Sequence, residues 1–177
     1  MKIQKITFIV LTLVLLAVPA LRVYQYENTL AHGKVFKFET QPVDPYDLFR
    51  GRYVALRFKA ERTDTAHPDL TYGAKIFMTL TVNAEGFAEV ESISTEPLKG
   101  ENVIIGRYDW RPRFPFDRYF MEENAAPEAE RVWRNAAGRN SGQKTWVQVR
   151  VLNGKAVLEG LYIDGVRIEE VLRNRNP

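Results

Sequence analysis

The stretch TWVQVRVLNGKAVLEGLYIDG, Thr145 to Gly165, indicates the fold of this chain most clearly. Residues 145–152 alternate between apolar and polar side chains, which is typical of a strand with one buried face. Asn153-Gly154 is the strongest short hairpin signal, and AVLEGLYI (156–163) predicts the returning strand. Asp164-Gly165 then predicts a second tight turn into VRIEEVL (166–172). The sequence therefore predicts consecutive antiparallel strands at its C-terminal end.

Segments further upstream show the same alternation. They are VFKFET (35–40), RYVALRF (52–58) and KIFMTLTV (75–82), and FAEVESI (87–93) returns from a turn at residues 83–86. Some of their apolar residues share one face of a strand and are expected to point into the core: Val54, Leu56, Phe58, Ile76, Met78, Leu80 and Val82.

One helix is predicted between the strands. PEAERVWRNAA, Pro127 to Ala137, begins with proline and acidic residues and ends before Gly138, which are correct start and stop signals. Val132 and Trp133 are expected to pack on the sheet. The predicted fold class is mainly β (α+β). It consists of an N-terminal transmembrane helix followed by an antiparallel β-meander, a curled sheet or half-barrel, with one packed helix.

Residues 1–23 predict a membrane anchor. Ile6 to Leu21 carries no charge, but sixteen helical residues reach only about 24 Å, less than the hydrocarbon core of about 30 Å. Extension back to Ile3 solves this, because the Lys5 side chain can reach the interface. Arg22 ends the apolar run. We expect a transmembrane helix at about residues 3–22, a linker at 24–34 and a β-rich domain at 35–177.

A cleaved signal peptide is the alternative to the anchor. Val18 and Ala20 loosely satisfy the small-residue rule for cleavage after Ala20. The apolar run is long for a cleaved peptide, so an uncleaved anchor is favoured. Both interpretations place Lys2 and Lys5 in the cytoplasm and the rest of the chain outside it. The sequence holds no second hydrophobic run, so a single N-terminal span is expected.

The composition excludes several classes of site. Cysteine is absent, which removes thiol catalysis, thiolate metal ligands and disulfides. The formal net charge is +3, and setting Lys2 and Lys5 aside leaves only +1. This balance gives no reason to expect nucleic-acid binding. His32 and His67 are the only histidines and lie in polar connecting stretches, so no metal site and no cofactor are predicted.

The stretch DPYDLFRGRYVALRF, residues 44–58, has the highest density of charged and turn-forming residues. On a structural interpretation Asp44 caps a short turn that Pro45 begins. Asp47 then faces the exposed amides of that turn, and Gly51 adopts a positive φ before the strand. A functional interpretation stays open beside it. Two arginines, Arg50 and Arg52, could join Asp47 in a groove and bind a phosphate, a carboxylate or a partner's acidic loop.

These features resemble the GDYXXLXY family of membrane-anchored bacterial proteins. The resemblance rests on PVDPYDLFRGRYVALRF (42–58), FPFDRYFMEENAAPEAE (114–130) and VRVLNGKAVLEGLYIDG (149–165). Arg52 replaces the Asp of the name-giving motif and Phe58 replaces its final Tyr. The binding or motif residues to which the resemblance points are Asp44, Pro45, Asp47, Arg50, Gly51, Arg52, Tyr53, Leu56, Tyr119, Phe120 and Glu122.

The resemblance implies a location and a partner, but no activity. It implies an anchor in the bacterial inner membrane with the C-terminal domain in the periplasm. Genes of this family often lie beside, or fused to, multi-spanning membrane domains. A multi-spanning membrane protein is therefore the expected partner.

Candidate catalytic groups are few. Asp47 and Glu122 could serve as acid and base in a glycan-directed envelope hydrolase, if folding brings them within about 5–10 Å of each other. Ser141 and Lys144 would form a serine–lysine pair, although their glycine-flanked loop has the composition of a connection.

A non-enzymatic binding or accessory module for a membrane or envelope partner is the favoured function, and the hydrolase is the alternative. The second of the three stretches that carry the resemblance, residues 114–130, is called the second block below. Its aromatic residues are either partner-facing or part of the core: Phe114, Phe116, Tyr119 and Phe120.

Overall fold

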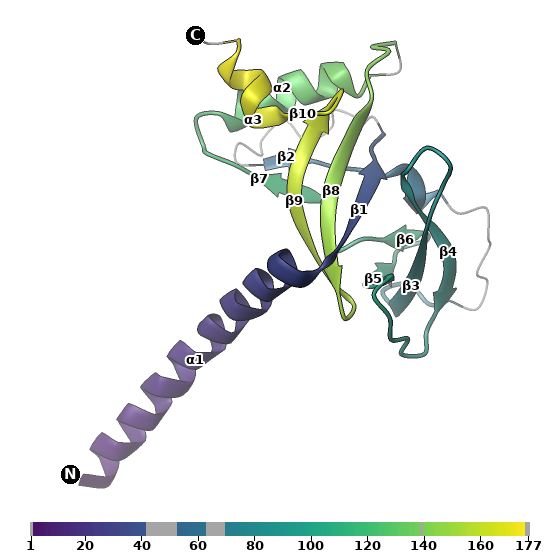
Figure 1. Ribbon diagram of the computed structural model, residues 1–177. Coiled ribbons are helices and arrows are strands. Elements are labelled where there is room, and N and C mark those ends of the chain that lie inside the picture. Colours follow the sequence, from purple (N-terminus) through teal and green to yellow (C-terminus); the bar gives the residue numbers. More distant parts are fainter. Residues whose placement is uncertain (1, 42–52, 63–69, 139, 176–177) are drawn as a thin grey trace.

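A computed structural model describes residues 2–41, 53–62, 70–138 and 140–175 (Figure 1). Helix α1 (Lys2–His32) projects from a β-rich body, and its apolar side chains are exposed. Its 31 residues correspond to a length of about 47 Å. The helix is long and apolar enough to cross a membrane, a property that an anchor and a signal sequence share.

The α1 helix continues through residues 24–32, where the sequence predicted a linker, and ends directly at the sheet. The Gly33 N–H donates to the Thr29 carbonyl over 2.9 Å. A Cβ on Gly33 would lie 2.4 Å from that carbonyl and 3.0 Å from the Val151 nitrogen. Only glycine therefore fits between α1 and the first strand.

The central sheet has the strand order β1-β8-β9-β10, and all its pairs are antiparallel. Its strands are β1 (Lys34–Glu39), β8 (Thr145–Leu152), β9 (Lys155–Ile163) and β10 (Val166–Arg167). The predicted hairpin is confirmed: Asn153 and Gly154 have φ values of 50° and 81°, as a type I′ turn requires. The N-terminal strand β1 thus pairs with a hairpin more than a hundred residues away in the sequence.

A second antiparallel sheet has the order β4-β3-β5-β6. It contains β3 (Lys75–Val82), β4 (Ala88–Ser94), β5 (Val103–Tyr108) and β6 (Pro112–Arg113). Ile76, Met78 and Leu80 are buried as predicted. Val82 is 52% exposed, contrary to prediction. It lies beyond Thr79, where pairing with β5 ends, so only β4 flanks it.

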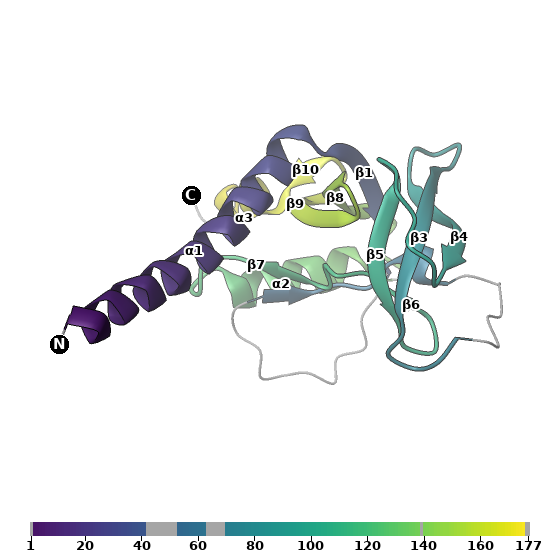
Figure 2. The ribbon, with the colours of Figure 1, turned by 90° about the horizontal axis from the view of Figure 1, so that it is seen from below.

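A short ribbon and one helix complete the body. Strands β2 (Tyr53–Ala55) and β7 (Arg118–Phe120) form the ribbon, and the 3-10 turn η1 (Lys59–Glu61) follows β2. Helix α2 (Ala126–Ala136) confirms the predicted helix and buries Val132 and Trp133. Figure 2 shows the ribbon and α2 on one side of the central sheet. The fold is mainly β with a curled, half-barrel sheet, as predicted.

The C-terminal segment differs from the prediction. VRIEEVL was expected as a strand, but only Val166–Arg167 pair, and helix α3 (Ile168–Arg173) follows. Glu169 and Glu170 lie in its first turn, where carboxylates favour a helix. Ile168 is buried, and Val171 and Leu172 follow it at the spacing of one helical face. The apolar residues of this segment therefore follow helical spacing, although residues 166–168 also alternate as in a strand.

Candidate functional site

Two of the three sequence blocks that resemble the GDYXXLXY family, residues 42–58 and 114–130, meet in the β2–β7 ribbon. Tyr53 pairs with Phe120, Val54 with Tyr119 and Ala55 with Arg118. Beyond the ribbon, the Leu56 N–H donates to the Asp117 carbonyl over 2.9 Å. Segments more than sixty residues apart therefore form one structural unit.

The inward side of this unit is hydrophobic core. Leu56 is 3% exposed, and Phe58 is fully buried. Four phenylalanine rings pack with centroid separations of 4.9–5.8 Å: Phe38, Phe58, Phe114 and Phe116. Phe114 and Phe116 are each 5% exposed, so the partner-facing interpretation is wrong for these two. Edge-to-face packing with Phe38 and Phe58 explains their inward orientation.

The outward side carries an exposed aromatic surface. Phe120 is 67% exposed, and its ring centroid lies 5.6 Å from that of Tyr53. The Arg118 guanidinium lies 5.0 Å from the Tyr53 ring centroid, within cation–π range. We call Tyr53, Arg118 and Phe120 the ribbon surface. Aromatic and arginine side chains of this kind are enriched at protein interfaces.

Tyr119 points to the other side of the ribbon and links β7 to α3. Its hydroxyl donates a hydrogen bond to the Glu169 carboxylate. Burial raises the pKa of Tyr119 to about 12, with the Glu169 hydrogen bond and charge adding to the effect and Arg167 opposing it. Tyr119 is therefore a neutral donor that stabilises the packing of α3, and it is not suited to act as a base near neutral pH.

The structure describes only one residue of the proposed acid–base pair. Glu122 is exposed just before α2, and its backbone carbonyl accepts hydrogen bonds from the Ala125 and Ala126 amides. The remaining predicted site residues lie outside the described part of the chain: Asp44, Pro45, Asp47, Arg50, Gly51 and Arg52. The Asp47–Glu122 pair and the arginine groove therefore stay predictions.

The serine–lysine pair is contradicted by the structure. The Ser141 hydroxyl donates to the backbone carbonyls of Ala136, at the end of α2, and of Gly138, the latter over 2.9 Å. The Lys144 ammonium instead pairs with Glu85 at 3.1 Å. The two side chains therefore make separate contacts and do not pair with each other.

A buried carboxylate that the sequence analysis missed lies at the end of η1. Glu61 is 2% exposed, and its Oε2 lies 3.7 Å from the Arg113 guanidinium but accepts no hydrogen bond from a described residue. Burial raises the pKa of Glu61, while Arg113, Arg111 and Arg57 lower it. Partial burial of the Arg111 guanidinium, together with the Arg113 charge, lowers the pKa of Arg111, and Glu61 opposes this effect. Arg57 lies four residues before Glu61, but Arg111 and Arg113 come from a distant segment, so the local sequence does not signal this cluster.

Metal binding finds no support in the described ranges. Within them, no group of three or more histidine, aspartate or glutamate side chains could hold a metal ion.

Comparison with known proteins gives one match. Residues 15–161 match the family described as "GDYXXLXY protein", which covers most of the chain. No curated protein and no solved structure matches significantly. The family match includes all the strands from β1 to β8, together with most of β9, and so spans both blocks of the ribbon. This protein therefore belongs to the GDYXXLXY family.

Proposed function

We propose that this protein is a membrane-anchored, non-enzymatic binding or accessory module for a membrane or envelope partner. In this proposal α1 is an uncleaved single span of the bacterial inner membrane, and the β domain lies in the periplasm. The expected partner is a multi-spanning protein of the same membrane.

The observation that carries the proposal is the direct connection between α1 and the central sheet. Lys155 on β9 donates to the Gln25 side chain of α1 over 2.6 Å. Arg150 on β8 donates to the Gly33 carbonyl over 3.4 Å. Flexible linkers let a domain search a wide volume, whereas this junction has no such segment. A fixed height and orientation above the bilayer suit a partner that is held in the same bilayer.

The ribbon surface is the part of the domain best suited to contact that partner. Phe120 and Tyr53 offer apolar area, and Arg118 adds a cation beside them. Interfaces depend most on a few buried aromatic and arginine side chains.

The test of the partner is co-purification from native membranes after crosslinking. The full-length protein should recover a multi-spanning protein in stoichiometric amount, and Phe120→Ser should reduce that recovery about tenfold or more. Trp110→Ser is the matched control, because Trp110 is 81% exposed but lies outside the ribbon surface. Recovery of the protein alone, or equal loss with both variants, would refute the proposal.

The test of the anchor is the intact mass of the protein taken from washed membranes. We expect a chain that retains its N-terminal segment and resists extraction at high pH. A chain that begins at Leu21 would show cleavage after Ala20 and exclude the anchor.

A further inference from the structure

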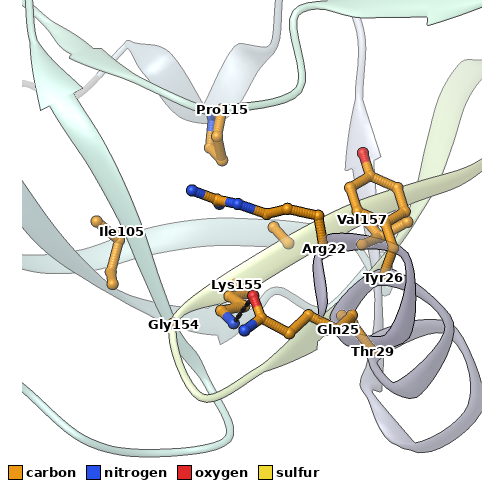
Figure 3. Close-up of a pocket in the computed structure, with 10 residues that line it drawn as sticks. Arg22, Gln25, Tyr26, Thr29, Ile105, Pro115, Gly154, Lys155 and Val157 are labelled. Carbon is orange, nitrogen blue, oxygen red and sulfur yellow. Dashed lines mark hydrogen bonds between the residues drawn. The ribbon is translucent and has the colours of Figure 1, made fainter. Parts of the chain in front are cut away.

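A cavity of about 400 Å³ lies at the junction of α1 and the body (Figure 3). Arg22 and Gln25 line it from the last turns of α1, and Lys155 and Val157 line it from the β8–β9 hairpin. Ile105 of β5 and Pro115 also line it. The volume falls within the usual range for small-ligand sites, about 300–1,000 Å³.

The cavity is positively charged. Arg22 and Lys155 are cations, and no carboxylate is among the described residues that line it. The Lys155 ammonium donates to the neutral Gln25 side-chain amide, drawn as the dashed line in Figure 3, and pairs with no carboxylate of a described residue. Arg22 makes no ion pair with any described residue, and Figure 3 shows its side chain reaching toward Pro115. An anion would therefore find two cations in place, beside an apolar wall.

The depth of the cavity points to the lipid headgroup layer, and this step rests on the proposed function. The twenty residues from Ile3 to Arg22 form about 30 Å of helix, which matches the hydrocarbon core. Headgroups occupy about 5–8 Å more on each side, or roughly three to five further residues of α1. Gln25 lies within that interval, so the cavity opens among the phosphates of the leaflet on the domain's side.

We propose that this cavity binds the headgroup of an anionic phospholipid from the surrounding membrane. The phosphate lies between Arg22 and Lys155. The glycerol and first methylene groups pack against Ile105, Pro115 and Val157. Such a lipid fixes the angle between α1 and the sheet, because it touches both.

The test uses the full-length protein in a nonionic detergent, with native mass spectrometry as the readout. Phosphatidylglycerol, phosphatidylcholine and inorganic phosphate are titrated separately. One basic side chain attracts anionic lipid about fivefold, so the pair should favour phosphatidylglycerol over phosphatidylcholine by about thirtyfold. The double variant Arg22→Gln/Lys155→Gln should lose that preference.

A matched control removes the same charge elsewhere. Lys99→Gln/Arg173→Gln alters two exposed cations outside the cavity and should keep the preference. Equal retention of both lipids, or equal loss with both double variants, would overturn the proposal. Binding of inorganic phosphate as tight as that of phosphatidylglycerol would also overturn it, since the ligand would then be the free ion.

The two proposals fail in different ways. An anchored protein that captures its partner but shows no lipid preference refutes only the lipid site. Cleavage after Ala20 refutes the anchor, while Arg22 remains in the chain and the same titration still tests whether the cavity binds the lipid.

Discussion

Glu61 shows how a single buried carboxylate makes stability depend on pH. Burial raises its pKa above the ordinary value of 4.5, and the arginines offset this only in part. In the pH window above 4.5 the folded chain therefore holds a proton that the unfolded chain has lost. The free energy of unfolding must then decrease as pH rises through that window, up to the folded pKa.

Glu61→Gln should abolish this decrease. The variant should match the wild type in acid and be more stable at neutral pH, because glutamine resembles the protonated carboxyl. Denaturant unfolding at several pH values, followed by tryptophan fluorescence, to which buried Trp133 contributes, measures this. Glu91→Gln, at an exposed position on β4, is the control and should leave the pH profile unchanged. A Glu61→Gln variant that is less stable at neutral pH would show that the arginines require the charge.

Replacement of a buried and of an exposed phenylalanine of the second block should change the free energy of unfolding by very different amounts. Phe116→Ala should cost about 3–5 kcal/mol, because it empties part of the four-ring cluster. Phe120→Ala should change stability by about 0.5 kcal/mol or less, since most of its ring is already exposed. Urea midpoints of the two variants decide the matter. Comparable losses would mean that Phe120 is part of the core.

The junction of α1 and β1 depends on a missing side chain. Gly33→Ala should destabilise the protein by about 1–3 kcal/mol, because its Cβ would clash with the backbone at Thr29 and Val151. Gly100→Ala is the control: its Cβ would contact only side-chain atoms of Asn102 and Val103. Thermal midpoints in detergent measure both. A Gly33→Ala variant as stable as the control would show that helix and sheet can separate at no cost.

The hairpin between β8 and β9 contacts both the second sheet and α1. The Ile105 N–H donates to the Gly154 carbonyl over 3.0 Å. A Cβ on Gly154 would lie 2.8 Å from the Ile105 side chain, and its φ is 81°. The turn glycine therefore meets two requirements, the type I′ geometry and the close approach of β5.

At the scale of the whole molecule, the β-rich domain is attached to the C-terminal end of α1. The eight residues of β8 span roughly 26 Å, from Leu152 near α1 to Thr145 at the other end. The Lys144–Glu85 ion pair lies at that other end. If α1 crosses the membrane, one end of the central sheet must face the bilayer and the other must not.

Labels at the two ends of the sheet test this orientation. The chain has no cysteine, so Leu152→Cys and Glu85→Cys each give a single fluorescent site. In reconstituted membranes, a quencher attached to lipid headgroups should reduce emission at residue 152 strongly and at residue 85 little. The same pair in detergent without the quencher is the control. Equal quenching at both sites would contradict a fixed orientation.

Local features could be predicted from the sequence because adjacent residues encode them. The Asn153-Gly154 turn, the α2 helix, the apolar α1 and the inward face of Val54, Leu56 and Phe58 depend on short-range backbone and side-chain preferences. The resemblance to the GDYXXLXY family is confirmed by the match over residues 15–161, which include both segments of the ribbon. Such signals need no knowledge of distant contacts.

Long-range contacts were decided only by the tertiary structure. The pairing of β1 with β8 and of β2 with β7 joins segments whose alternation would suit other partners equally well. The burial of Glu61 and the cavity beside Arg22 each need residues from separate elements to converge. The sequence by itself therefore determined the family, the turns and the apolar helix. The packing of apolar faces, summed over the whole core, decided which strands pair and which side chains stay exposed.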